Sequence, residues 1–142
     1  MTRVDFYLLE QDGLDTARFA CRLIDKAFRL GHRVYVLTPD ADAGGHLDEL
    51  LWTFQAGSFV PHATVGPGLP TEDSPPVLIG WGEPPEDAHD VLVPLTPDVP
   101  AFFARFDRVV EIVGADSGDK ERSRAHFRFY RDRGYPLEVH RL

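Results

Sequence analysis

Residues 3–37 read RVDFYLLEQDGLDTARFACRLIDKAFRLGHRVYVL, and this stretch decides the fold. Residues 3–9 are rich in β-forming side chains and predict a first, largely buried strand. Residues 15–30 have the periodicity of a helix, and residues 33–37 predict a second strand. A strand, a helix and a strand joined by short connections indicate a right-handed parallel crossover, which is the building unit of an α/β sheet.

The predicted helix has one apolar face and a recognisable end. Gly31 follows the last periodic residue, where a glycine commonly ends a helix. The first strand is broken before the helix at Gln11, Asp12 and Gly13. The side chains that share the apolar face are Ala17, Ala20, Cys21, Ile24, Ala27 and Phe28.

The rest of the chain continues the alternation of strands and helices. Asp40 or Asp42 is expected to cap a helix that continues to about Phe54. Residues 55–76, rich in proline and glycine, are expected to form a long connection without regular structure. The elements expected after it are neighbouring strands at 77–81 and 91–95, a short helix at 100–106, a strand at 108–113, a helix at 117–133 and an edge strand at 135–140.

This order predicts a single three-layer α/β/α domain, residues 1–142, around a mostly parallel central sheet. Such a domain is Rossmann-like, but the joint after the first strand argues against a nucleotide site. Residues 10–15 contain one glycine and three acids, whereas a phosphate-binding loop needs several glycines that expose backbone N–H groups. Asp40, after the second strand, is interpreted as a helix cap rather than a ribose-binding acid.

The composition is that of a globular protein, the use of cysteine suits the cytoplasm, and no motif predicts a catalytic site. Hydrophobic residues make up 43% and charged residues 27%, and no apolar run approaches the roughly 20 residues of a membrane span. The lone Cys21 excludes an internal disulfide and, on an apolar helix face, is expected to be a core residue. The histidines lack Cys or His partners at metal-ligand spacing, so no metal or cofactor is expected.

The charge is unevenly distributed along the chain. The net charge is -8, which argues against direct binding of phosphates as the main function. Residues 120–133, however, contain six Lys or Arg residues and only two acids. An acidic protein with one basic helix is expected to attract an anionic partner at that helix.

Two segments contain candidate interface residues, and the first is LDELLWTF at residues 47–54. Trp52 lies on the polar side of this predicted amphipathic helix, where a large ring is a candidate interface anchor. Phe59, Val60 and Pro61 follow after a short loop and extend the same patch. The other interpretation is that Trp52 covers residues 55–76 as a small satellite core.

The second segment is the basic helix near the end of the chain. Its helical positions place Phe127 within a stripe of cations, with Val113 at the end of the strand before it. Ala125, His126, Phe129 and Tyr130 fall on the opposite half and are expected to face the core. The stripe suits a ligand with acids and a hydrophobic end, although a solvated basic face is the other interpretation. The cations of the stripe are Lys120, Arg124, Arg128 and Arg131.

At these same residues the sequence resembles the chi subunit family of bacterial DNA polymerase III. The resemblance rests chiefly on residues 47–52, LDELLW, followed by residues 58–62, SFVPH. It extends to residues 6–9, 31–34, 76–79 and 130–135. Nearly the whole chain is therefore covered by an ordered set of motifs.

The resemblance implies an adaptor with no chemistry of its own, although the complex to which it belongs is a DNA-directed DNA polymerase. Chi proteins join the clamp loader, through a 1:1 heterodimer with the small psi subunit, to the C-terminal tail of single-stranded-DNA-binding protein. DNA is then contacted only indirectly. The tail site implied for this chain consists of Val113, Lys120, Arg124, Phe127 and Arg128.

The surface implied for psi consists of Trp52 and Phe59, with Val60 and Pro61 beside them. A repair helicase is expected to dock on this surface in place of psi. Two other classes of function are considered beside the adaptor: a nucleotide- or small-molecule-binding α/β enzyme, and a direct binder of single-stranded nucleic acid. The first predicts a ligand pocket at the C-terminal ends of the strands, and the second predicts DNA binding with a steep salt dependence.

Overall fold

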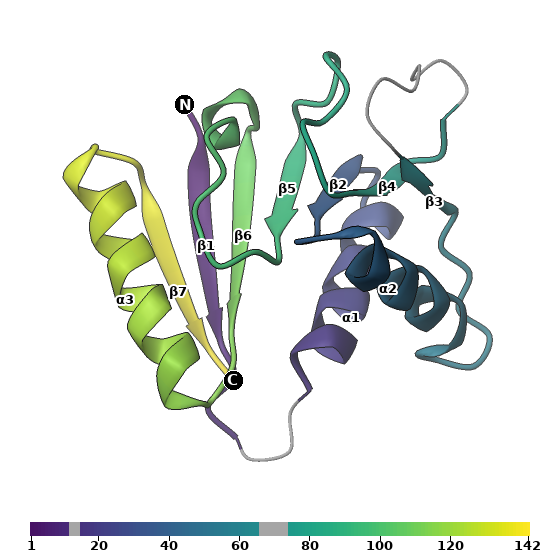
Figure 1. The fold of residues 1–142 in the computed structure, drawn as a ribbon, viewed down its shortest axis with the longest axis horizontal. Helices are drawn as coiled ribbons and strands as arrows, with labels where there is room; N and C mark the ends of the chain where they lie inside the picture. The colour runs from purple at the N-terminus through teal and green to yellow at the C-terminus, as the bar shows by residue number, and fades with distance from the viewer. Residues whose placement is uncertain (12–14, 66–73) are drawn as a thin grey trace.

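The computed structural model describes residues 1–11, 15–65 and 74–142. In these residues all paired strands are parallel and form one sheet, in the order β3-β4-β2-β5-β6-β1-β7 (Figure 1). This confirms the predicted α/β fold. The strands are β1 (Arg3–Leu8), β2 (Val34–Leu37), β3 (His62–Val65), β4 (Val77–Gly80), β5 (Val91–Pro94), β6 (Arg108–Val113) and β7 (Leu137–Arg141).

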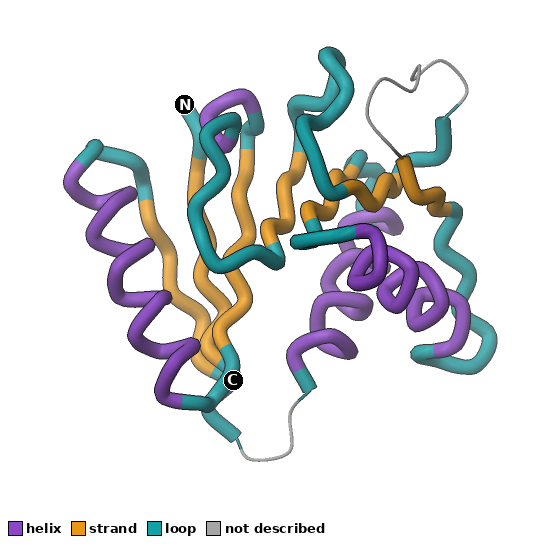
Figure 2. Tube along the Cα trace, viewed as in Figure 1, coloured by secondary structure: helices purple, strands orange, loops and turns teal. Residues whose placement is uncertain are grey.

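Helices flank the sheet on both sides, which makes three layers (Figure 2). The first face packs against α1 (Thr16–Arg29) and α2 (Ala41–Thr53), which contact each other. The second face packs against α3 (Ser117–Asp132) and the 3-10 turn η1 (Phe103–Arg105). No helix in the described part of the chain is long and apolar enough to span a membrane.

Strand periodicity assigns the side chains to two cores. Val34 and Val36 of β2 pack in the cluster that contains Ile24 of α1, whereas Tyr35 and Leu37 pack in the cluster that contains Tyr130 of α3. Successive side chains of a strand point to opposite faces, so the buried central strand contributes to both. Burial of apolar surface in both clusters is the main force that holds the layers together.

The helix ends follow local sequence signals. The carboxylates of Asp15, Asp40 and Asp116 accept hydrogen bonds from backbone N–H groups in the first turns of α1, α2 and α3. Asp40 is thus the cap of α2, as the sequence interpretation favoured. Gly31 and Gly134 follow α1 and α3 with φ of 88° and 80°, in the left-handed region that glycine adopts readily.

The prediction that residues 55–76 lack regular structure is wrong for β3. His62 pairs with Val77 of β4, and the side chain of Val60 just before the strand is fully buried. Pairing with a strand further along the chain supplies stability that local proline and glycine content does not reveal. Residues 66–73 of this predicted connection lie outside the described residues, as do Asp12 and Gly13 of the predicted break after the first strand.

The expectation that the strands near 77–81 and 91–95 are neighbours is also wrong. β2 lies between them, because Val34 pairs with both Val77 and Val91. All four residues of β2 are buried, so this strand is stable only in the interior of the sheet. The predicted edge strand is confirmed as β7, and the predicted helix near 100–106 is the shorter turn η1.

We expect Gly80→Ala to destabilise the fold by about 1–3 kcal/mol. A Cβ at Gly80 would collide with the ring of Tyr35, which is buried and whose hydroxyl donates a 2.6 Å hydrogen bond to the Gly82 carbonyl. Urea denaturation measures the loss. Gly45→Ala is the control, because that position in α2 has open space around it and alanine favours a helix. Equal stability changes in the two variants would contradict this prediction.

Candidate functional site

A pocket of about 550 Å³ lies between α3 and the C-terminal ends of β6, β1 and β7. Apolar side chains from all four elements line it, together with Lys and Arg side chains of α3 and β7. The pocket brings together all five residues of the predicted tail site. The residues that line it are Phe6, Leu8, Leu9, Glu10, Val113, Gly114, Lys120, Ser123, Arg124, Phe127, Arg128, Arg131, Val139 and Arg141.

The orientation of α3 is set by a buried polar network on its inner face. The Tyr130 hydroxyl donates a 2.9 Å hydrogen bond to Glu111 of β6, and both residues are buried. The second oxygen of the Glu111 carboxylate is 3.1 Å from His126 Nδ1, and His126 Nε2 is 2.8 Å from the Pro97 carbonyl. Both imidazole nitrogens therefore face acceptors, an arrangement satisfied by the protonated ring, which has two donors.

Titration of this network follows from its contacts. The hydrogen bond to Glu111 raises the pKa of His126, partly opposed by burial. Burial, with the nearby Glu111 charge, raises the pKa of Tyr130, which therefore remains a hydroxyl donor.

The half of α3 that was predicted to face the core is confirmed at Tyr130, which is buried. Ala125 was predicted on the same half, but it is exposed.

Phe127 and Val113 are the two predicted site residues that contribute to the apolar lining of the pocket. Phe127 is half-buried, with its ring centroid 5.5 Å from that of Phe6, and it still lines the pocket. Val113 is buried at the end of β6. The sheet beneath Phe127 covers one side of the ring and leaves the other as part of the pocket surface.

The cations of the pocket differ in whether they already have an acidic partner. Among the residues that the structure describes, no carboxylate lies within ion-pair distance of Lys120, Arg124 or Arg128. Arg131 pairs with the adjacent Asp132, and Arg141 pairs with Glu10. A cation without an internal partner is available to an external carboxylate.

Sequence reasoning missed the part of the pocket that comes from β7. Val139 and Arg141 line the pocket from this edge strand, and Glu10 lines it just beyond β1. The available signal was the period-2 pattern of residues 137–141, which puts alternate side chains on the face covered by α3. That signal becomes useful only when β7 is known to pair with β1.

The predicted second surface is formed by two exposed rings beside α2. Trp52 is 48% exposed and Phe59 is 65% exposed, and their ring centroids lie 5.5 Å apart. Trp52 also contacts His62 of β3 at 4.3 Å, so it covers part of the following connection and presents its other side to solvent. Pro61 is half-buried beside them. Val60, predicted as part of this surface, is instead fully buried in the core cluster that contains Leu47 and Leu51 of α2.

A second cavity, of about 440 Å³, lies where the enzyme hypothesis expects one, beyond the ends of β5 and β6. Capping carboxylates already occupy three of the backbone N–H groups at the helix N-termini near this cavity. The Asp15 carboxylate accepts from Ala17 N, and the Asp116 carboxylate accepts from Gly118 N and Asp119 N. The Arg122 guanidinium at this cavity is bound to Asp119. These contacts compete with a phosphate for the donors that a helix N-terminus would offer it.

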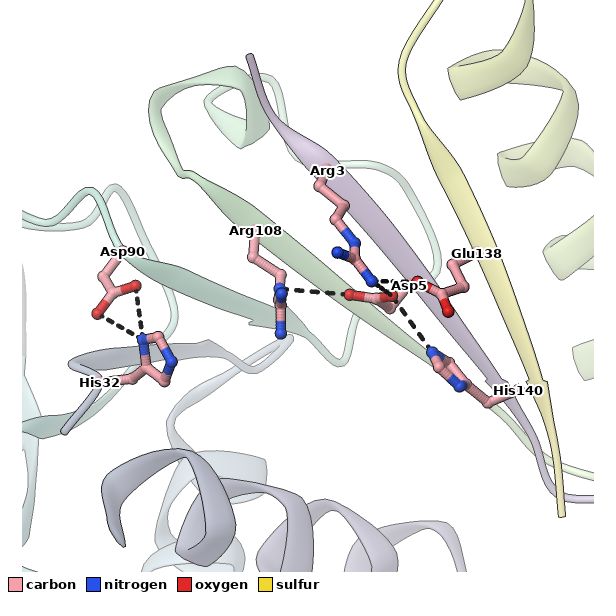
Figure 3. A network of polar contacts seen from close by, with 7 residues as sticks. All are labelled: Arg3, Asp5, His32, Asp90, Arg108, Glu138 and His140. Carbon is pink, nitrogen blue, oxygen red and sulfur yellow. Dashed lines mark hydrogen bonds and ion pairs between the residues drawn. The ribbon is translucent and has the colours of Figure 1, made fainter. Parts of the chain in front are cut away.

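Three potential metal ligands converge on the opposite face of β1 and β7, although their sequence spacing gave no sign of it. Ligand atoms of Asp5, Glu138 and His140 lie within 4.8 Å of one another. Arg3 contacts both carboxylates, and Arg108 Nε is 3.4 Å from Asp5 Oδ2 (Figure 3). The guanidinium groups of Arg3 and Arg108 thus offset the negative charges of Asp5 and Glu138. A divalent metal ion would have to displace these guanidinium groups.

The single cysteine is not a nucleophile in this structure. Cys21 belongs to α1, and its side chain is fully buried in the core, as predicted. Burial raises the pKa of its thiol to about 12, so the reactive thiolate is scarce at neutral pH.

Comparison with known proteins gives full-length relatives. A family model described as DNA polymerase III chi subunit, HolC, matches residues 1–138. DNA polymerase III subunit chi of Pseudomonas aeruginosa is 42% identical over 144 residues, covering 100% of this chain and 98% of that protein. Its counterpart in Escherichia coli strain K12 is 32% identical over 145 residues, covering 98% of this chain and 97% of that protein.

A solved structure with little sequence identity shares the fold. The crystal structure of T4 UvsW superposes with a TM-score of 0.69 at 8% identity. The match covers 99% of this chain and 41% of the UvsW chain. At this identity the likeness concerns the fold alone.

We expect His126 to stabilise the protein more at low pH than at high pH. Its pKa is raised above the ordinary value of about 6.5, so the stability it contributes is fully present below that pH and is lost as the pH rises through the folded-state pKa. The difference in free energy of unfolding between the parent and His126→Gln should therefore be larger near pH 6 than near pH 9. Urea denaturation at each pH measures it, with the exposed His46→Gln as control. The same pH trend in both variants would argue against this role of His126.

Proposed function

The chain belongs to the DNA polymerase III chi subunit family, and on this premise we propose that it is a non-catalytic accessory subunit of the DNA polymerase III holoenzyme. It links the clamp loader, through psi, to the C-terminal tail of single-stranded-DNA-binding protein during DNA replication. It acts in the cytoplasm as a single domain of residues 1–142, needs no cofactor or metal, and contacts DNA only indirectly.

The observation that carries the proposal is the pocket beside α3, whose lining combines apolar side chains with a cluster of cations in a protein with a net charge of -8. The tail of single-stranded-DNA-binding protein has several aspartates, then a short apolar stretch that closes with phenylalanine and the free carboxylate. Such a tail needs an apolar site for a ring, a cation for the α-carboxylate and looser cations for the aspartates. The pocket contains each of these parts.

The residues of the pocket divide between these tasks. Phe127 and Val113 contact the terminal ring, since they belong to the apolar lining. Arg124 or Arg128 binds the α-carboxylate, because a guanidinium grips a carboxylate at two points whereas lysine offers a point charge. Lys120 and Arg131 lie on the same helix and attract the aspartates. A short peptide on this surface is expected to bind at about the micromolar level, or about 8 kcal/mol.

The second surface takes the psi subunit in a 1:1 heterodimer, or a repair helicase in its place. Trp52 and Phe59 are large, adjacent and substantially exposed, which suits the anchors of a protein interface. Pro61 extends the patch, and the buried Val60 holds the connection in position. This surface and the pocket are formed by different elements, so the protein can bind both partners together.

We expect the double variant Arg124→Ala, Arg128→Ala to bind the tail peptide far more weakly than the parent. Loss of the guanidinium that holds the α-carboxylate should cost about 1.5–3 kcal/mol, and Lys120→Ala should cost under about 1 kcal/mol. Isothermal titration calorimetry measures both. Higher salt should weaken parent binding, because the charge pairs are exposed.

Arg122→Ala is the matched control for this experiment. Arg122 lies on the same helix, but its guanidinium is bound to Asp119 and it lines the other cavity. A peptide with an amidated C-terminus tests the α-carboxylate directly, and single-stranded DNA and nucleotides test the other classes of function. Unchanged peptide affinity in the double variant would sink the tail assignment.

We expect Trp52→Ala to weaken psi binding by about 2 kcal/mol or more while tail-peptide binding stays at the parent value. The ring is half-exposed, so its removal should leave the fold intact. Surface plasmon resonance with immobilised psi measures the loss. Leu30→Ala removes another large exposed side chain outside the Trp52–Phe59 contact and serves as control. Equal losses in both variants would show that the effect is not specific to this surface.

A further inference from the structure

Glu10 is the one acid among the described residues that line the basic pocket. It forms an ion pair with Arg141, which lines the same pocket. An acid within a site for an acidic peptide opposes binding, because it repels the carboxylates of the peptide. The cation that Glu10 contacts indicates where in the pocket this effect acts.

The position of this pair follows from the pairing of β1 with β7. Leu8 lies opposite Arg141, and beyond the strands the chains stay paired through 3.0 Å hydrogen bonds between Leu142 N and Leu8 O and between Glu10 N and Leu142 O. The two strands end together beside the first turn of α3 (Figure 1). Alternation of side chains puts Glu10 and Arg141 on the pocket side together with Val139.

The pair divides the cations of the pocket into two kinds. Among the described residues, Lys120, Arg124 and Arg128 have no carboxylate within ion-pair distance, whereas Arg141 is held by Glu10. Both side chains of the pair are about half exposed or more, so water and ions reach them and the pair is weak enough to exchange. An incoming carboxylate can take the place of Glu10 on the guanidinium.

We propose that Glu10 competes with the carboxylates of the acidic tail for Arg141, and that Arg141 is a further tail-binding cation released only when the peptide displaces Glu10. This inference rests on the proposed tail-binding function. A ligand with a single carboxylate gains nothing at Arg141, because one acid merely replaces another. A ligand with several acids already held by the α3 cations presents a high local concentration of carboxylate to Arg141 and displaces Glu10. The pair therefore selects for clustered acids.

The competition changes the salt dependence of binding as well as its strength. In the parent, binding at Arg141 breaks one ion pair and makes another, so the number of pairs is unchanged. In Glu10→Gln the same contact is a net gain of one pair. Salt screens exposed charge pairs, so the variant should bind more tightly at low salt and lose affinity more steeply as salt rises.

The experiment is a double-mutant cycle measured by calorimetry with the acidic tail peptide that ends in phenylalanine and a free carboxylate. Glu10→Gln should bind the peptide about two- to fivefold more tightly than the parent. In the Arg141→Gln background the same change should give a clearly smaller gain, because the competition no longer exists. Glu10→Asp keeps a carboxylate and should bind close to the parent value.

The outcomes separate this inference from the proposed function. If the parent binds and Glu10→Gln binds equally or more weakly, Glu10 does not compete, and the inference is overturned while the tail site stands. An equal gain in both backgrounds would mean that Glu10 acts only through general repulsion, which also overturns it. If no protein of the cycle binds the peptide, the proposed function and the inference fail together.

Discussion

The buried hydrogen bond from Tyr130 to Glu111 is the contact on which the candidate site depends. A buried carboxylate is costly unless its oxygens are bonded, and Tyr130 and His126 together bond both oxygens of Glu111. Because both partners come from α3, they define how this helix is rotated on the sheet. That rotation turns Phe127 toward Phe6 and directs the arginines of the outer side into the pocket.

The pocket combines an apolar surface with cations that have no acidic partner in the described part of the chain. Two other cations of α3 each have an acid beside them: Arg122 pairs with Asp119, and Arg131 pairs with Asp132. Lys120, Arg124 and Arg128 have no acid within ion-pair distance among the described residues, and they adjoin an apolar surface. Placing unpaired cations beside exposed apolar atoms gives the free protein little stability. Such an arrangement suits the acidic, partly apolar peptide that we propose as its ligand.

Local signals allowed much of the fold, and the residues that line the pocket from α3 and the end of β6, to be predicted. The cap at Asp40 and the glycine after α1 define helix ends within a few residues of chain, so neighbouring side chains are sufficient to identify them. The basic stripe around Phe127 is likewise a property of one helix. The strand β3 was missed because its stability comes from β4, and the burial of Val60 was missed because the core that covers it is non-local.

The sequence by itself determined the alternation of strands and helices, the two cores, the basic stripe and the family, because these depend on periodicity and on ordered motifs along the chain. Only the tertiary structure decided the strand order, the closure of the pocket by β7 and the pairing of Glu10 with Arg141. These two residues are 131 positions apart, and they meet because β7 returns beside β1 after α3 crosses the sheet. Which distant strands become neighbours depends on how much apolar surface the packed layers bury in total. No local stretch of sequence determines that area.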